Sequence, residues 1–461
     1  MESERALARF VAGFPLAEVP AEPLRMVRRI VMAVCGTAAA GAEEAGIAEL
    51  RALLIERGGA PQATVLIHGD RLPAASAAML NGTMCRALDF CDAMAPGPHI
   101  GSSLFPAAMA AAELRGGCSG AELLAALAMG AEVGARMNLT EAMYDGFDPT
   151  GVAVVFAATA AAARVLGLDE ARTHHALALA FNRCAGSFQS NVDGSLAVRL
   201  IQGWTTEAAV TCAQLAQRGL TGPANFLEGH YGYAHLFGRG LLKAADVVDQ
   251  LGAHWRIQRT MFKKFPSCGV TQGVTDLALR LAREHRLSAD DVASGRVTLP
   301  PYAWRLVGHA FRLGESPRVD AQFNAGWCVA NALVRGASRL AHFTPDAVRD
   351  EAIVALARRI EVVADPAMDA RGHSAVDLQL RTRDGRALAA GHDVAPGYPD
   401  NPLSDAEHEA RFADCMDYAP RKLARAAELR ATIEGMESLT DARALLSMLV
   451  AGADELAGIA D

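Results

Sequence analysis

The sequence lacks the short motifs by which many cofactor-dependent enzymes are recognised. No GxGxxG follows a predicted strand and no GxxxxGK[ST] occurs, so nucleotide binding has no support. HExxH and GxSxG are absent too, and the adjacent His174 and His175 lie in a helical run where their rings diverge. We therefore expect neither a metal nor a cofactor. The remaining classes are a cofactor-free enzyme and a helical binding protein.

An excess of basic residues is also missing. The 461 residues include 44 Lys and Arg against 52 Asp and Glu, a formal net charge of −8. This balance argues against nucleic acid or an anionic membrane as a partner, because there is no basic excess to displace counterions. Nearly uncharged stretches contain Pro and Gly or fall short of the roughly 20 residues that span a bilayer. The start, MESERALARF, lacks the layout of a signal peptide, so we expect no membrane anchoring.

Paired cysteine motifs are absent as well. The nine cysteines are scattered, their total is odd, and none forms a CxxC pair. This usage is typical of a reduced cytoplasmic protein whose cysteines mostly lie in the core.

The sequence does contain many Ala- and Gly-rich segments with helical periodicity. They are expected to be helices over residues 22–42, 46–57, 74–88, 105–114, 119–137, 150–166, 169–185 and 196–218, with one short strand at 63–67. Hydrophobic residues make up 51% of the chain, and its length exceeds what one ordinary core needs. The first half is therefore expected to form a large all-helical body.

The composition changes after about residue 255. Ser288 to Asp291 has the pattern of a new helix N-terminus, and strands are expected near 297–299 and 360–363. Val376, Leu378 and Leu380 then alternate before an Asp384-Gly385 turn, which predicts a hairpin. Residues 404–460 are helical and charged again. The fold class is thus mainly α, with an all-helical domain (1–257 and 397–461) and a smaller α+β domain (258–396).

One loop concentrates groups that carry chemistry. The stretch 87–103 breaks a helical pattern and places Asp89, Asp92 and His99 within eleven residues. Loops between helices disproportionately carry functional residues. The alternative is structural, with Asp92 starting a turn, His99 capping the next helix and Asp89 solvated.

Several segments together resemble the MmgE/PrpD family, which holds 2-methylcitrate dehydratase, cis-aconitate decarboxylase and iminodisuccinate epimerase. The likeness extends over roughly residues 25–420. Its segments are ALDFCDAMAPGPHIGSSLFPAAMAAAE (87–113), GFDPTGVAVVFAATAAAARVLGLD (146–169), AGSFQSNVDGS (185–195), GLTGP (219–223), FKKFPSCG (262–269) and GYPDNPLS (397–404).

The resemblance implies a helical domain built from both chain ends, an inserted α+β lid, a homodimer and no cofactor. It also implies a small carboxylic acid as substrate, from which a proton, water or carbon dioxide is removed next to a carboxylate. By position, Asp89, His99 and Lys263 match family active-site residues. The sequence departs from the family pattern at Cys91, Ala93, Asp148, Val198 and Trp327. Cys268 stands where the decarboxylase-like members have histidine, and cysteine is also common in the family at this position.

Proton removal next to a carboxylate needs a base near the carbon and cations on the carboxylate oxygens. Asp89 or His99 is the candidate base, and Lys263, with Lys264 or Arg199, is the candidate carboxylate ligand. Further candidate substrate-binding residues are Tyr144, Asp148, Gln189 and Trp327. The helix beginning near Thr150 offers amides to an anion, but a carboxylate at position 148 works against that role.

Cys91 and Cys268 suggest a two-base epimerisation if both thiols face one carbon. Their alternative is simple burial in the core. The leading prediction is a dehydratase-type lyase, followed by an epimerase and then a decarboxylase. A family member that binds small acids without catalysis is the remaining alternative.

Overall fold

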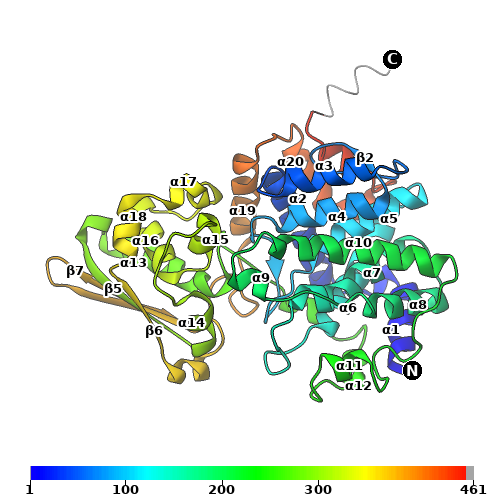
Figure 1. The fold of residues 1–461 in the computed structure, drawn as a ribbon, viewed down its shortest axis with the longest axis horizontal. Coiled ribbons are helices and arrows are strands. Elements are labelled where there is room, and N and C mark those ends of the chain that lie inside the picture. The colour runs from blue at the N-terminus through cyan, green and yellow to red at the C-terminus, as the bar shows by residue number, and fades with distance from the viewer. Residues whose placement is uncertain (1, 453–461) are drawn as a thin grey trace. The chain divides into compact units, whose positions relative to one another are not determined.

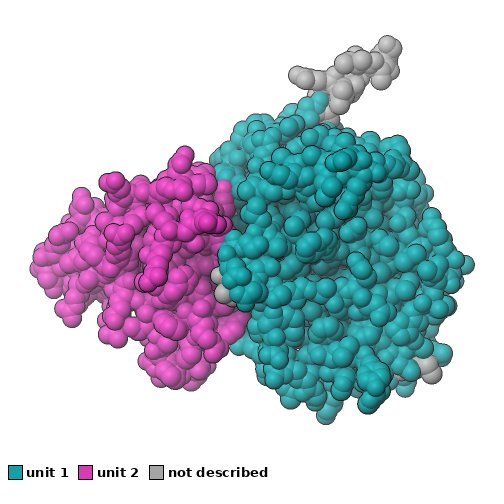
Figure 2. All heavy atoms as spheres, viewed as in Figure 1, with its two compact units in different colours: residues 1–260, 415–461 teal, residues 261–414 magenta. Residues whose placement is uncertain are grey.

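The computed structural model describes residues 2–452 and divides into two compact units (Figure 2). The first unit holds the described residues up to Thr260 and from Cys415 onward, so both ends of the chain contribute to it. The second unit is Met261–Asp414. Within residues 2–452, no helix has both the length and the apolar character that crossing a membrane requires.

The first unit is mainly helical, with three two-residue strands (Figure 1). Its elements before the site loop are α1 (Glu2–Gly13), η1 (Leu16–Glu18), α2 (Ala21–Gly41), α3 (Ile47–Arg57), β1 (Ala63–Thr64), β2 (Arg71–Leu72) and α4 (Ala74–Arg86). After β3 (Asp92–Ala93), they are α5 (Gly101–Arg115), α6 (Gly120–Met137), η2 (Thr150–Val154), α7 (Val155–Val165), α8 (Glu170–Phe181), α9 (Gln189–Val192), α10 (Ala197–Gln217), α11 (Tyr233–Leu236), α12 (Ala244–Val248) and η3 (Arg256–Arg259). The mainly α prediction is therefore confirmed.

Local sequence explains several of these boundaries. Ser119 and Glu122 form the expected capping box at the start of α6, in which the Ser119 hydroxyl accepts from the Glu122 amide. Helix α5 begins at Gly101, four residues earlier than expected. The reason is that the Asp92 carboxylate accepts from the Gly101 amide at 3.0 and 3.2 Å and so satisfies the helix start.

Helices α4 and α10 pack against each other with unusually close backbones. A Cβ atom on Gly82 would lie 2.4 Å from Thr206 Oγ1, and one on Gly203 would lie 2.2 Å from Thr83 Oγ1. Only glycine fits at these two contacts. The close approach brings the middle of α10 next to the helix that leads into the site loop.

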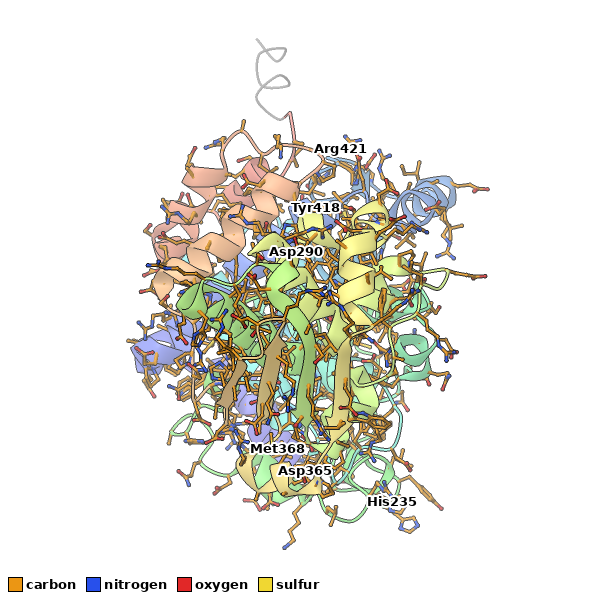
Figure 3. The ribbon with its side chains drawn as sticks, turned by 90° about the vertical axis from the view of Figure 1, so that its left-hand side faces the viewer. His235, Asp290, Asp365, Met368, Tyr418 and Arg421 are labelled. Atoms are coloured by element: carbon orange, nitrogen blue, oxygen red, sulfur yellow. The ribbon has the colours of Figure 1, made fainter. Side chains whose placement is uncertain are left out.

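The C-terminal segment of the first unit joins it through specific contacts. Its helices are the end of α19 (Asp405–Tyr418), then α20 (Ala426–Glu434), η8 (Met436–Ser438) and α21 (Ala444–Met448). Tyr418 and Arg421, labelled in Figure 3, donate hydrogen bonds of 2.8 Å to Glu44 and Glu43, respectively. The predicted helical region extended to residue 460; residues 453–460 lie outside the described part.

The second unit is built on a four-stranded sheet of order β6-β5-β7-β8. Strand β5 (Val292–Leu299) pairs parallel with β6 (Ile360–Ala364) and antiparallel with β7 (Val376–Thr382), which pairs antiparallel with β8 (Ala387–His392). Val376, Leu378 and Leu380 are buried in the core, as their alternation predicted. In Figure 3, Asp290 and Asp365 mark opposite ends of this sheet.

Short helices complete the second unit. They are η4 (Gly269–Thr271), α13 (Gln272–His285), η5 (Ala289–Asp291), α14 (Pro301–Val307), α15 (Pro317–Gln322), α16 (Ala325–Arg335), η6 (Leu340–Phe343), α17 (Pro345–Val348), α18 (Glu351–Ala357) and η7 (Pro366–Arg371), together with β4 (Met261–Phe262). Of these, α13 contacts β7 and β8, and α16 contacts β6.

Two expectations for this region need revision. Ser288 caps a single 3-10 turn, η5, that leads directly into β5, so the predicted helix there is wrong. The unit also continues to Asp414, past the expected end at 396. The Pro- and Gly-rich segment packs as part of the unit, because Gly397 accepts from the Phe262 amide at 3.0 Å and Asn401 donates to the Val394 carbonyl at 3.0 Å.

Candidate active site

The site loop begins where α4 ends, at Arg86. Arg86 NH1 lies 2.5 Å from Asp89 Oδ1, and both side chains are only 9% exposed. Asp89 has a φ of +52°, a left-handed conformation that Asp and Asn tolerate better than most side chains. In this turn the Asp89 carboxylate lies next to the Arg86 guanidinium. The pair is therefore a buried ion pair at the mouth of the loop.

The imidazole of His99 is held by the same loop. Its Nδ1 lies 2.7 Å from the backbone oxygen of Asp92 and 3.4 Å from Cys91 Sγ. Because a carbonyl only accepts hydrogen bonds, Nδ1 carries the proton in neutral His99. The lone pair is then on Nε2, which lies 3.8 Å from Asp89 Oδ1. The loop thus joins a carboxylate, an imidazole and a thiol.

Asp148 is the other buried carboxylate near Arg86. Its Oδ1 accepts from the Thr150 amide at 2.8 Å. Burial raises the pKa of the Asp148 carboxyl, although the Arg86 guanidinium and two backbone amides oppose that shift. Asp148 therefore occupies amides at the start of the following helix that an anionic ligand would otherwise use. The sequence pointed to this conflict, and the structure shows the contact.

Arg86 is the cation common to these carboxylates. Burial acts to lower the pKa of its guanidinium, but Asp89, Cys91 and Asp148 outweigh burial and raise that pKa. Sequence reasoning did not select Arg86, because an arginine in the last turn of a helix is ordinary there. The spacing of Arg86 and Asp89, three residues apart across a helix end, is the signal that could have found it.

Three other predicted residues of the first unit have identifiable partners. Tyr144 packs edge-on against Phe147 and Phe188, with ring centroids 5.3 and 5.9 Å apart. Arg199 is buried, and its NH1 donates to the Ala45 carbonyl at 2.8 Å. Gln189 is exposed and donates to the Asp193 carboxylate at 2.7 Å. The substrate-binding roles of these three residues remain predictions.

The predicted lysines lie in the second unit. Lys263 is buried, and its backbone oxygen accepts from Arg411 Nε at 2.5 Å. Lys264 forms ion pairs of 2.9 Å with both Asp276 and Glu407. Burial acts to lower the pKa of Lys264, but the two carboxylates outweigh burial and raise it. Lys264 is thus charged and committed to partners within its own unit.

Cys268 ends the loop that Lys263 begins, and a buried glutamine holds this loop. Gln272 Oε1 accepts from the Phe265 amide at 2.8 Å, and its Nε2 lies 3.0 to 3.2 Å from the carbonyl oxygens of Phe265, Ser267 and Cys268. Cys268 itself is buried in the core of the second unit. Its partner in the epimerase hypothesis, Cys91, is buried in the first unit.

Trp327 belongs to the same core as Cys268. It is fully buried, and its ring packs against Phe343 at 5.0 Å and Phe311 at 6.3 Å between centroids. Its position is explained by packing, and the substrate role that the sequence suggested stays a prediction. Within residues 2–452, no group of three or more His, Cys, Asp and Glu side chains is arranged to hold a metal ion.

Comparison with known protein domains identifies both parts of the chain. Residues 5–243 match the MmgE/PrpD N-terminal domain, and residues 265–434 match the MmgE/PrpD C-terminal domain. The chain belongs to the MmgE/PrpD family. The resemblance inferred from the sequence segments is thereby confirmed.

Curated members of the MmgE/PrpD family are similar over most of their length. A cis-aconitate decarboxylase-like protein, oryM, of Aspergillus oryzae is 25% identical over 418 residues, covering 84% of each chain. The human cis-aconitate decarboxylase is 25% identical over 354 residues, covering 74% of this chain and 72% of the human protein. The mouse cis-aconitate decarboxylase is 23% identical over 399 residues, covering 82% and 79%, respectively.

Proposed function

We propose that this MmgE/PrpD protein is a cofactor-independent lyase that removes a proton next to a carboxylate of a small organic acid. The observation that carries the proposal is the state of His99. Its Nδ1 proton is directed at the Asp92 carbonyl, so the lone pair lies on Nε2. A neutral imidazole whose lone pair lies on one ring nitrogen can act as a general base, a role that histidine fills more often than any other side chain.

The neighbouring carboxylate supports this assignment. Asp89 Oδ1 lies 3.8 Å from Nε2, where its charge stabilises the imidazolium that forms when His99 takes a proton. Arg86 in turn neutralises Asp89 and holds it in place through the 2.5 Å ion pair. In this proposal His99 is the base, Asp89 the electrostatic partner and Arg86 a positioning residue.

The enediolate that follows proton removal requires a cation on the carboxylate oxygens. Lys263 is the proposed cation, on the basis of its match to the family motif FKKFPSCG. Lys264 is a weaker candidate, because Asp276 and Glu407 already compensate its charge. A Lys263→Met variant is expected to keep the fold and lose turnover.

Dehydration is the leading reaction, and the relatives named cis-aconitate decarboxylase make decarboxylation of a tricarboxylate a specific candidate to compare. Epimerisation with Cys91 and Cys268 as the two bases remains an alternative. The 3.4 Å contact between Cys91 Sγ and His99 Nδ1 favours Cys91 over Cys268 as a participating thiol. Non-catalytic binding of small acids is the remaining alternative.

Product analysis separates these reactions. The purified protein is incubated with cis-aconitate and a panel of di- and tricarboxylates with their hydroxy and amino derivatives, and products are followed by proton NMR. A new olefin without loss of carbon indicates dehydration, loss of carbon dioxide indicates decarboxylation, and a new diastereomer indicates epimerisation. No reaction with any compound, together with a raised melting temperature, would replace the lyase with a binding protein.

A further inference from the structure

The peptide groups around His99 are held from two sides by residues outside the loop. The His99 amide donates to Thr150 Oγ1 at 3.1 Å, and the His99 carbonyl accepts from Gln202 Nε2 at 2.9 Å. Thr150 opens a π-helical turn, Thr150–Val154, and Gln202 lies within α10. Short π-helical turns are rare and are enriched at functional sites.

Gln202 is itself held rigidly. Its Nε2 also lies 2.6 Å from Ser103 Oγ, and Ser103 Oγ donates to the Gln202 backbone oxygen at 3.1 Å. The side chain is 1% exposed, and the neighbouring Gly203 permits the close contact of α10 with α4. Thr150 is buried as well. Gln202 Oε1 is buried and has no hydrogen-bond partner within residues 2–452, so the contacts of Nε2 orient the side-chain amide.

A buried side chain thus bonds the His99 amide and another bonds the His99 carbonyl. The imidazole ring is held separately, by the Asp92 carbonyl. A polar residue buried in a core is costly unless its hydrogen bonds are made. The common target of both bonds is the backbone of His99. Both bonds hold the His99 backbone, from which the imidazole reaches the Asp92 oxygen.

We propose that Gln202 and Thr150 are positioning residues that keep neutral His99 in the Nδ1-protonated tautomer, with Nε2 available as the base. The catalytic meaning of this tautomer rests on the function proposed above. The tautomer itself does not. A measurement of His99 alone can therefore fail or succeed independently of any assay of turnover.

The test is nitrogen-15 NMR of the full chain labelled at histidine, with the signal of His99 assigned by its loss in His99→Gln. In the wild type, at a pH where His99 is neutral, Nδ1 is expected to show the shift of a protonated ring nitrogen and Nε2 that of an unprotonated one. In Gln202→Met and Thr150→Val, the opposite tautomer is expected to appear. In Thr150→Ser, which restores the hydroxyl, the wild-type tautomer is expected to return.

The matched control is Thr205→Val, on the same helix. Thr205 is buried, and its hydroxyl donates to the Ile201 carbonyl at 2.8 Å, within the helix. This variant removes a buried hydroxyl without touching His99, so its His99 tautomer is expected to match the wild type. Ser103→Ala is a milder test variant. It removes a hydrogen-bond partner of Gln202 and keeps the Gln202 side chain, so the opposite His99 tautomer is expected to appear in it as well.

Two results would overturn the proposal. One is a folded Gln202→Met or Thr150→Val protein with an unchanged His99 tautomer. If both variants fail to fold, an unchanged tautomer in Ser103→Ala overturns it instead. Where a substrate is turned over, the positioning role also predicts a kcat about 10- to 100-fold lower with KM changed far less, since small misplacements of a base reduce rate more than binding.

Discussion

Asp89 adopts a backbone conformation that few side chains accept, and this conformation is what returns its carboxylate to Arg86. The sequence was sufficient to select Asp89 and His99, because both lie in a loop whose sequence resembles a segment of the MmgE/PrpD family. It was not sufficient to select Arg86, Thr150 or Gln202. These residues lie in helical segments, and the packing of α10 against α4 and η2 directs them at the loop.

Two substitutions of Asp89 are expected to separate the contribution of its charge to stability from that of its backbone conformation. Asp89→Asn removes the ion-pair partner of the buried Arg86, although the charge of Asp148 stays near it, and breaking a buried pair costs about 3 to 5 kcal/mol of unfolding free energy. Asp89→Ala is expected to cost a further ~1 kcal/mol, because alanine tolerates a positive φ poorly. Urea unfolding of the full chain measures both.

The matched control for Asp89 is Asp145→Asn. Asp145 is 76% exposed and lies 3.7 Å from Arg239, so its loss is expected to change stability by less than about 0.5 kcal/mol. Equal stability of Asp89→Asn and the wild type would contradict the buried ion pair.

Asp148 provides a pH-dependent prediction. Its pKa is raised in the folded protein, mainly by burial, so between about pH 4 and that raised pKa the folded state binds more protons than the unfolded state. The contribution of Asp148 to stability therefore falls as pH rises through this window. Asp148→Asn keeps an acceptor for the Thr150 amide and removes the titration.

Unfolding free energies of Asp148→Asn and the wild type at several pH values between 4 and 7 measure this effect. The variant is expected to gain stability relative to the wild type as pH rises. A difference that stays constant would show that Asp148 has an ordinary pKa in the folded state, and one that runs in the opposite direction would show that its pKa is lowered there.

At the scale of elements, helices with strong capping and periodic signals were predictable, as the capping box at Ser119 shows. The π-helical turn at Thr150–Val154 was not, because nothing in a sequence distinguishes it from the first turn of an α-helix. The error at Ser288 has a similar cause. A capping box satisfies the first amides of any helical turn, and here the β-branched residues that follow continue as a strand in the sheet.

Gln272 is predicted to hold the loop that carries Lys263 and Cys268. Gln272→Leu removes the amide that bonds Phe265, Ser267 and Cys268, and is expected to cost about 1 to 3 kcal/mol. The amides of Lys264, Phe265, Ser267 and Cys268 are expected to exchange with solvent faster, as measured by hydrogen exchange and mass spectrometry.

Thr275→Val is the control for this effect on the same helix. The Thr275 hydroxyl is buried and donates to the Thr271 carbonyl at 3.0 Å, within the helix itself. Similar exchange of the loop in Gln272→Leu and Thr275→Val would show that Gln272 has no special hold on it.

At the scale of the whole molecule, the mainly α class and the family were both predictable, because they depend on patterns repeated over hundreds of residues. The extent of the second unit was less predictable from the sequence. Residues 397–402 have the composition of a linker, yet the Gly397 carbonyl bonds to the Phe262 amide and the Asn401 side chain bonds to the Val394 carbonyl. Composition indicates how flexible a segment is in isolation. In the folded protein, tertiary hydrogen bonds can fix such a segment in place.

The family resemblance predicts a homodimer. Sedimentation equilibrium of the full chain at micromolar concentration is expected to give twice the chain mass of 48.5 kDa. A mass of one chain across that range would remove the dimer from the account and leave the proposed chemistry of the first unit unchanged.

The central claim, that His99 removes a proton next to a carboxylate, is tested most directly by solvent exchange. The wild type, His99→Gln and the exposed-histidine control His254→Gln are incubated in heavy water with the carboxylate panel and followed by proton NMR. The account predicts that one carbon-bound proton signal disappears with the wild type and with His254→Gln, and persists with His99→Gln. Exchange that continues undiminished in His99→Gln would contradict it.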